Sequence, residues 1–198
     1  RPTNHKVFGE ATAMLAGDTL LTEAFYILSC KGSEASLSSE QISKAVKYLS
    51  LYAGYRGMIG GQMIDMAFQN KDISAKIIEE MYLLKTSALF KASCVLGCIA
   101  ANADEEKIKA AIDFAENLGL AFQIRDDILD VIGNTEDLGK KTGSDDNNNK
   151  STYLKLIGME KAEKLIEKYT DDAVKNLKNF KNNEFMIYIT NLLVNRSK

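Results

Sequence analysis

Three aspartates stand close together at positions 122–130, where the sequence reads FQIRDDILD. On a helix, Asp126 and Asp130 share one face, and Asp127 lies one turn before Asp130. Like charges at this spacing destabilise a helix unless a cation lies between them. Mg²⁺ suits that position because it binds one or two carboxylates together with water and phosphate oxygens. The polar run GKKTGSD at 139–145 adds lysines for phosphate groups. We therefore expect a site for magnesium and a diphosphate.

An alternative interpretation is a solvated acidic helix surface, which is what most runs of charge are. Large apolar side chains surround the aspartates, namely Phe122, Ile124, Ile128, Leu129, Val131 and Ile132. A segment this apolar is not expected to be freely exposed. We therefore expect its acidic face to border a groove, with an apolar wall that could receive a hydrocarbon chain.

Five segments of the sequence together resemble one family, the trans-polyprenyl diphosphate synthases, which include farnesyl and geranylgeranyl diphosphate synthases. FQIRDDILD is similar to the second aspartate-rich motif of that family, and GKKTGSD with KSTY at 150–153 resembles the lysine-bearing loop that follows it. The other similar segments are RPTNHKVFGE at 1–10, GGQMID at 60–65 and LKTSA at 84–88. All five occur in the order typical of the family, which is more specific than an isolated pair of aspartates. The chain beyond Leu156 adds no such motif.

The resemblance implies a prenyltransferase that condenses isopentenyl diphosphate with an allylic diphosphate, with Mg²⁺ as its cofactor. In that reaction the allylic C–O bond breaks and pyrophosphate leaves, after which the alkene of isopentenyl diphosphate attacks the carbocation. The departing pyrophosphate can take up the proton that is then lost. Cations near the leaving group would neutralise the charge that develops on it. Farnesyl diphosphate is the first expected product and geranylgeranyl diphosphate the second.

By the same resemblance, the ligands of the metal and of the diphosphate can be assigned. The expected metal ligands are Asp126, Asp130 and Asp145, and the expected diphosphate-binding residues are Lys85, Lys140 and Lys150. Lys85 lies in an otherwise apolar helix, where a lysine either extends to water or meets an anion. Both outcomes are open from the sequence alone.

The remaining site residues are also assigned by resemblance. Thr86 and Gln123 are expected to turn oxygen atoms toward the carbocation. With Lys85 and Lys140 they form the expected catalytic set. Asp127, Gln62 and Asp65 are expected to lie just outside the ligands, although hydrogen bonding between helices would equally explain Gln62 and Asp65.

Composition indicates a single soluble, globular domain over residues 1–198, and apolar residues at helical spacing predict that this domain is all-α. The chain has 198 residues, of which 45% are hydrophobic and 26% charged, and it contains one proline. The net charge of -2 gives no reason to expect nucleic acid as a partner. No apolar run is long enough to suggest stable insertion into a membrane.

The cysteine and histidine content limits the disulfides and metal sites that this chain could form. An odd number of cysteines, three, argues against a disulfide framework and favours a cytoplasmic location. Cys94 and Cys98 are expected to fill apolar space. His5 is the only histidine, which excludes a histidine-rich metal site.

Apolar periodicity predicts helices almost throughout. The expected ranges are 7–30, 38–70, 74–101, 104–133, 152–180 and 182–195, with a polar loop at 134–150. Ser38 and Gln41 form an expected capping box at the start of the second helix. Glycines at 54 and 57 interrupt that helix and are expected to allow close packing between helices.

The fold expected from the resemblance is an isoprenoid synthase type helical bundle that is incomplete at its N-terminus. The family carries a first aspartate-rich motif immediately before the segment that resembles 1–5, and this chain lacks it. We therefore interpret the chain as the C-terminal two-thirds of a synthase and expect negligible turnover by this part alone. A homodimer is also expected. The alternatives are a terpene cyclase-like protein, a noncatalytic synthase subunit, and a helical interaction module.

Overall fold

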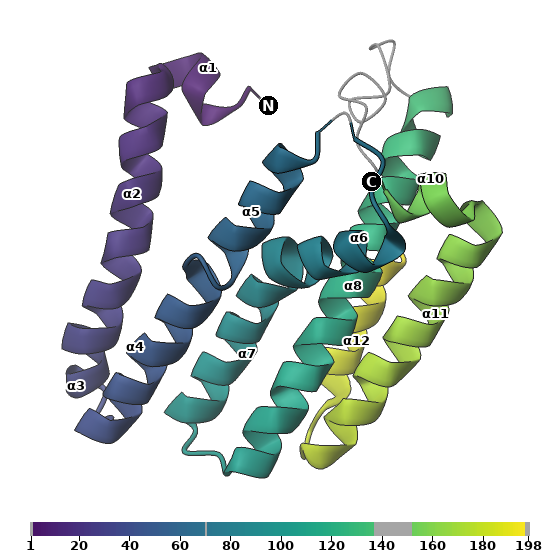
Figure 1. Ribbon diagram of the computed structural model, residues 1–198. Helices are drawn as coiled ribbons and strands as arrows, with labels where there is room; N and C mark the ends of the chain where they lie inside the picture. Colours follow the sequence, from purple (N-terminus) through teal and green to yellow (C-terminus); the bar gives the residue numbers. More distant parts are fainter. Residues whose placement is uncertain (1, 70, 137–151, 197–198) are drawn as a thin grey trace. The chain divides into compact units, whose positions relative to one another are not determined.

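The computed structural model describes residues 2–69, 71–136 and 152–196, and every regular element in these ranges is a helix (Figure 1). This confirms the all-α prediction. Contacts group the chain into two compact units, Arg1–Leu49 and Ser50–Lys198. The expectation of one domain over 1–198 stays a prediction.

The first unit begins with short and long helices separated by a glycine. Its elements are α1 (Asn4–Phe8), α2 (Glu10–Tyr26), a π-helical turn η1 (Ile27–Lys31), α3 (Gly32–Glu34) and the beginning of α4 (Ser39–Ala53). The helix expected at 7–30 is interrupted at Gly9, whose φ of 87° lies in the left-handed region that favours glycine.

The predicted capping box at the start of α4 is confirmed in both of its hydrogen bonds. The Gln41 backbone N–H donates to Ser38 Oγ at 3.1 Å, and the Ser38 N–H donates to Gln41 Oε1 at 3.0 Å. Two N–H groups that an α-helix leaves unpaired are thereby satisfied, so this short motif fixes where α4 begins.

The single helix expected over 38–70 is wrong, because residues 54–57 divide it into α4 and α5 (Met58–Ala67). A Cβ atom on Gly57 would lie 2.1 Å from the carbonyl oxygen of Tyr52, and one on Gly54 would lie 2.5 Å from that of Ser50. These near neighbours belong to the preceding turn of the same segment. The two glycines therefore serve the turn between α4 and α5, and the expected packing between helices is not what requires them.

The second unit continues from α5 into a long, bent helical segment. That segment consists of α6 (Ala75–Tyr82), the π-helical turn η2 (Leu83–Ser87) and α7 (Ala88–Ala100). Figure 1 shows the chain changing direction where α6 passes through η2 into α7. Bends of this kind are typical of π-helical turns, which also occur frequently at functional sites.

The rest of the second unit consists of α8 (Glu105–Glu136), α10 (Tyr153–Ile157), α11 (Met159–Asn176), the short 3₁₀ turn η3 (Leu177–Asn179) and α12 (Glu184–Val194). The long helix α8 packs against α7, α11 and α12, which run beside it (Figure 1). Gly158, with φ at 80°, separates α10 from α11, so the helix expected at 152–180 is also divided. The described part of the expected loop at 134–150 remains helical to Glu136.

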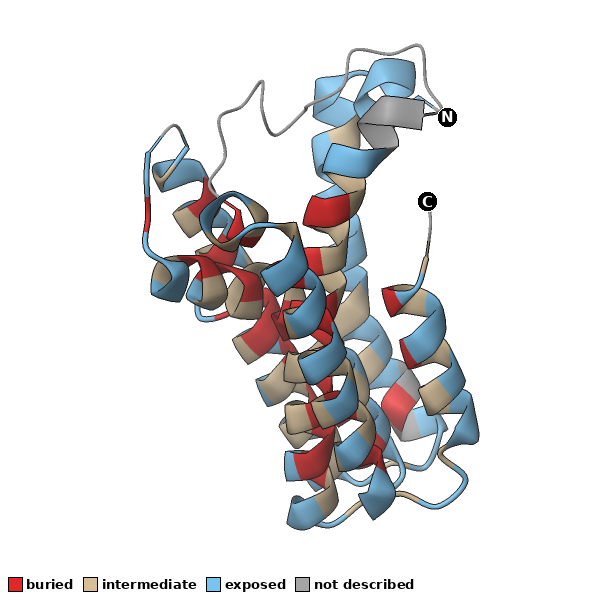
Figure 2. Ribbon diagram, turned by 90° about the vertical axis from the view of Figure 1, so that its right-hand side faces the viewer, coloured by how far each residue is buried: buried red, intermediate tan, exposed pale blue. Residues whose placement is uncertain are grey.

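The hydrophobic core of this unit lies along α8. Figure 2 marks the buried positions. Fully buried large side chains include Ile78, Ile108, Phe114, Ile124 and Ile128. Val131 and Ile132, by contrast, are 49% and 44% exposed. The apolar run beside the aspartates is therefore core at its beginning and surface at its end.

The helical stretch Ala75–Ala100 is long and apolar enough, by length and composition, to cross a membrane, which differs from the expectation drawn from the sequence. Core helices of soluble proteins meet the same criterion. Here the stretch contributes Ile78, Tyr82 and Val95 to the core. Its lysines at 85 and 91 form ion pairs with Asp65 and Glu116.

Candidate diphosphate and magnesium site

A chain of side-chain hydrogen bonds joins α8 to η2 at the expected site. Thr86 Oγ1 donates to Gln123 Oε1 at 2.6 Å, and Gln123 Nε2 donates to Asp127 Oδ1 at 3.3 Å. The Tyr82 hydroxyl donates to the other carboxylate oxygen of Asp127. Tyr82 and Asp127 are buried, whereas Thr86 and Gln123 are half-buried. This series of hydrogen bonds therefore runs from the buried core to a more accessible face.

Lys85 lies beside this chain and pairs with a carboxylate of another helix. Its Nζ lies 2.7 Å from Asp65 Oδ2 on α5. Lys85 thus pairs with a carboxylate of the protein, and its expected contact with a diphosphate stays a prediction. Gln62 is exposed on the same helix.

Two glycines bring the backbone of η2 close to α5 and α8. A Cβ atom on Gly61 would lie 2.2 Å from the backbone nitrogen of Lys85. One on Gly119 of α8 would lie 2.7 Å from the Cα atom of Ser87. The hydroxyl of Ser87 also donates to the backbone carbonyl of Glu116 at 3.3 Å. Glycines on both sides therefore set the position of Lys85 and Thr86.

The carboxylate of Asp126 forms an ion pair with Arg196, near the C-terminal end of the chain. The guanidinium carbon of Arg196 also lies 3.8 Å from the centre of the Phe122 ring, a cation–π contact. Burial, and to a lesser degree the charge of Arg125, lowers the pKa of Arg196. Arg196 therefore places a positive charge beside Asp126.

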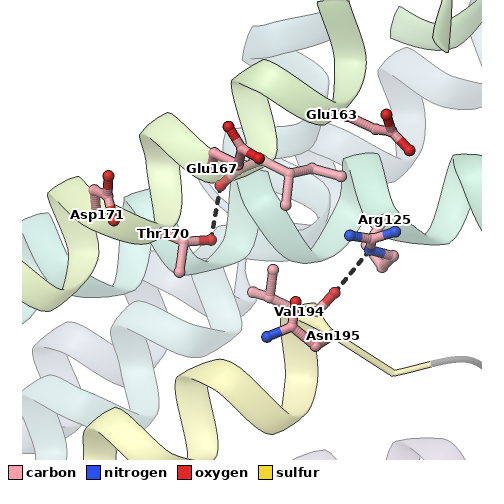
Figure 3. A pocket seen from close by; sticks show the side chains of 8 residues that line it. Arg125, Glu163, Glu167, Thr170, Asp171, Val194 and Asn195 are labelled. Carbon is pink, nitrogen blue, oxygen red and sulfur yellow. Dashed lines mark hydrogen bonds between the residues drawn. The ribbon is translucent and has the colours of Figure 1, made fainter. Parts of the chain in front are cut away.

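Arg125 holds the segment that carries Arg196. Its Nε donates to the carbonyl oxygen of Val194 at 2.7 Å, at the end of α12. Figure 3 shows this contact in a pocket of about 560 Å³ formed by α8, α11 and the end of α12. The α11 side of the pocket carries Glu163, Glu167 and Asp171, which lie on successive turns of that helix. Two neighbouring residues of α8, Arg125 and Asp126, thus both contact the C-terminal segment.

The three aspartates do not converge on one point. Asp127 turns into the core toward Tyr82, whereas Asp126 and Asp130 are half-buried on one face of α8. Within the described ranges, no group of three or more His, Cys, Asp or Glu side chains is placed to hold a metal ion. Mg²⁺ binds proteins through as few as one or two carboxylates, with water and phosphate oxygens completing its octahedron. Asp126 and Asp130 meet that requirement, whereas Asp127 does not, because it turns into the core.

The structure thus brings together Lys85, Thr86, Gln123 and Asp127, and it places Asp65 against Lys85. Asp126 lies on the same turn of α8. The other expected ligands, Lys140, Asp145 and Lys150, lie outside the described residues. The roles assigned to all these residues stay predictions.

Two residues of this site were missed from the sequence. Arg196 lies beyond Leu156, in the part of the chain that carries no recognised motif, so only the three-dimensional structure brings it to Asp126. Tyr82 gave a weak signal, since a tyrosine in an apolar helix usually needs a hydrogen-bond partner when it is buried. Its ring packs edge to face on Tyr153, with ring centres 5.6 Å apart. Burial, followed by the charge of Glu79, raises the pKa of Tyr153.

Known proteins similar to this chain are prenyl diphosphate synthases. The farnesyl diphosphate synthase of Bacillus subtilis is 43% identical over 173 residues, which cover 87% of this chain and 58% of that protein. Geranylgeranyl pyrophosphate synthase 4 of Arabidopsis thaliana is 38% identical over 202 residues, covering 100% of this chain and 53% of that protein. The chain therefore spans a little more than half the length of these relatives.

Solved structures give the same result for the fold. The FPP/GFPP synthase of Zymomonas mobilis superposes with a TM-score of 0.83 at 31% identity, covering 98% of this chain and 64% of that one. The Helicobacter pylori geranyltransferase in complex with magnesium and isoprenyl diphosphate superposes with a TM-score of 0.78 at 34% identity, covering 98% and 63%. The predicted isoprenoid synthase type bundle is thus confirmed.

The family model described as polyprenyl synthetase matches residues 1–190, which is nearly the whole chain. The match includes α8 with its aspartates and η2 with Lys85 and Thr86. The chain belongs to the polyprenyl synthetase family.

Proposed function

We propose that the protein containing this chain is a Mg²⁺-dependent trans-prenyltransferase that joins isopentenyl diphosphate to an allylic diphosphate. One observation carries the proposal. The hydrogen bond from Thr86 to Gln123 ties the turn that bears Lys85 to the helix that bears Asp126 and Asp130. A cationic group, uncharged oxygen atoms and carboxylates thereby border one region, as the ionisation of a diphosphate ester requires.

Each group has a distinct part in that reaction. Asp126 and Asp130 would hold Mg²⁺, which supplies positive charge to the oxygens of the leaving pyrophosphate when bound. The Lys85 side chain is 33% exposed, so that its Nζ can turn from Asp65 toward a phosphate oxygen. The Thr86 and Gln123 oxygens would face the allylic carbon as positive charge develops on it. The new C–C bond forms there, and the proton lost from the adduct passes to pyrophosphate.

Arg196 and Mg²⁺ would compete for Asp126, because the guanidinium contacts Oδ1 of that carboxylate. A metal ion that takes this oxygen would displace Arg196, while the contact from Arg125 to Val194 would hold the end of α12 in place.

The proposal includes a homodimer in the cytoplasm, with farnesyl diphosphate as the first expected product and geranylgeranyl diphosphate as the second. Helix α2 supports the dimer because it exposes Met14, Leu15 and Leu20 and buries none of its residues within the structure. A soluble monomer rarely leaves a helix this apolar without a partner. The unpaired thiols of Cys30, Cys94 and Cys98 support a reducing compartment.

Calorimetry with inorganic pyrophosphate tests the site in this chain itself. We expect pyrophosphate to bind with MgCl₂ present and to bind much more weakly with EDTA. Asp126→Asn should weaken the Mg²⁺-dependent binding at least tenfold. The matched control is Asp113→Asn, which removes a carboxylate of the same helix that pairs with Lys109. Equal binding by all proteins, or none by the unchanged chain, would favour a helical interaction module.

A second experiment tests the reaction. The full-length protein that contains this chain should incorporate radiolabelled isopentenyl diphosphate into an allylic product when MgCl₂ is present. A terpene cyclase-like protein would instead release a cyclic product without consuming isopentenyl diphosphate. A noncatalytic subunit would bind pyrophosphate without forming either product.

A further inference from the structure

The hydrogen-bond chain Tyr82, Asp127, Gln123 and Thr86 has a direction, which is set at its buried end. A carboxylate has only acceptor atoms, and Asp127 accepts a hydrogen bond from Tyr82 on one oxygen and from Gln123 on the other. Gln123 must therefore turn its NH₂ group toward Asp127. Its carbonyl oxygen then points the other way, toward Thr86.

The hydrogen bonds keep the same donor-to-acceptor direction at the accessible end of the series, at Thr86. Thr86 has one hydroxyl proton, and it is donated to Gln123 Oε1 at 2.6 Å. With this proton committed, the Thr86 oxygen offers only lone pairs to its remaining surroundings. The half-buried end of the chain is therefore a pair of acceptor oxygens beside Lys85, with both of their nearest donors turned inward.

We propose that Tyr82 is a positioning residue for the reaction, because it holds Asp127 in the orientation that keeps Gln123 and Thr86 acceptor-only. This inference rests on the proposed prenyl transfer. Its new element is that a buried tyrosine, which does not touch the substrate, holds the carboxylate that sets the preference of the site for a positively charged carbon.

The opposite orientation shows why this restraint matters. If the Gln123 amide turned over, its NH₂ group would donate to Thr86, whose own proton would then point outward. The accessible end would offer hydrogen-bond donors to a developing cation, which they would destabilise. The two amide orientations have the same shape, so packing alone does not choose between them, and the hydrogen bonds to Asp127 do.

Tyr82→Phe is the direct test, since it keeps the ring in its contact with Tyr153 and removes only the hydroxyl. Asp127 then loses a partner that fixes its carboxylate, and Gln123 loses the restraint on its amide. Tyr153→Phe is the matched control, because it removes a neighbouring buried hydroxyl whose interaction is with Glu79. Asp127→Asn is a second variant that acts on the same chain, in case Tyr82→Phe does not fold.

The measured quantity is a ratio of two affinities, determined by calorimetry with MgCl₂. One ligand is an allylic diphosphate analogue with a protonated nitrogen at the reacting carbon, and the other is the matched neutral carbon analogue. The unchanged protein should prefer the cationic analogue. Tyr82→Phe and Asp127→Asn should reduce that preference roughly threefold to tenfold, the range that one hydrogen bond supports. The affinity for inorganic pyrophosphate should stay unchanged in Tyr82→Phe, and Tyr153→Phe should resemble the parent.

Two results would overturn the inference. An unaltered preference in a folded Tyr82→Phe would show that the hydroxyl does not set the polarity, and an equal loss for both analogues and pyrophosphate would show a purely structural role. A different result marks failure of the proposed function: an unchanged protein that binds neither analogue nor pyrophosphate with Mg²⁺ has no diphosphate site.

Discussion

Lys85 and Asp65 form an ion pair whose partners differ in exposure, since the side chain of Lys85 is 33% exposed and that of Asp65 only 9%. The pair joins η2 to α5 with 2.7 Å between Nζ and Oδ2. A lysine that loses this partner can extend to water, whereas a buried aspartate that loses its partner cannot. Substitution of Lys85 and substitution of Asp65 are therefore expected to change the free energy of unfolding by different amounts.

We expect Lys85→Met to lower the free energy of unfolding by roughly 1–3 kcal/mol, because it leaves a buried carboxylate without this partner. Asp65→Asn should lower it by less. Urea denaturation followed by circular dichroism gives both values. Lys109→Met is the control, since Lys109 and Asp113 form an exposed pair on one helix. A larger loss for Asp65→Asn than for Lys85→Met would contradict this account.

Gly61→Ala is expected to destabilise the second unit. The added Cβ would lie 2.2 Å from the Lys85 nitrogen, and the obstructing atoms belong to the backbone. Overpacking of this kind lowers stability by roughly 1–3 kcal/mol or more. Gly97→Ala on α7 is the opposite case, because its Cβ would meet nothing within 4 Å. It should raise stability by up to about 1 kcal/mol through helix propensity. Similar melting shifts in both variants would argue against the close approach of α5 and η2.

Arg196→Gln is expected to increase affinity for a divalent cation in the absence of any diphosphate. The metal need not then compete with a guanidinium for Asp126, and a partly exposed ion pair of this kind corresponds to at most about fivefold in affinity. The signal of free Mn²⁺ in electron paramagnetic resonance measures the change directly. Arg56→Gln removes an arginine that lies against Tyr55 and should have no effect. Unaltered Mn²⁺ binding in Arg196→Gln would show that the ion pair does not compete with the metal.

The cysteines should differ in their rates of alkylation, and the difference should depend on pH. Burial, and to a lesser degree Cys98, raises the pKa of Cys94 to about 11, so the reactive thiolate is scarce at neutral pH. Cys30 is exposed and should react first with iodoacetamide. The rate at Cys94 should rise about tenfold per pH unit up to its pKa, as the thiolate fraction does. Peptide mass spectrometry resolves the sites, and rapid modification of Cys94 at pH 7 would contradict its raised pKa.

The sequence predicted most of the helices because apolar periodicity and caps are local signals. The capping box at Ser38 is an example, since both partners lie within one turn. The break between α4 and α5 was missed because glycines in a helical pattern are compatible with either a bend or close packing. The structure shows that Gly57 is required by the turn, because an added Cβ atom would collide with the carbonyl oxygen of Tyr52. The sequence does not give the position of that oxygen.

The site was predictable where its residues share one element and was not where the fold joins distant ones. Asp126 and Asp130 share a face of α8 by spacing alone. That Asp127 turns inward became clear only with Tyr82, which is 45 residues away in sequence. Arg196 lies 70 residues from Asp126, so no local pattern could have predicted their pairing.

The wide turn η2, at Leu83–Ser87, makes the length of this segment a constraint that is separate from its composition. A π-helical turn accommodates one more residue than an α-helical turn. A one-residue deletion here would convert the wide turn into an ordinary α-helical turn and remove the bend between α6 and α7, which would move Lys85 and Thr86 away from Asp65 and Gln123. Libraries built on this scaffold should therefore vary which amino acids occupy the turn and keep their number constant.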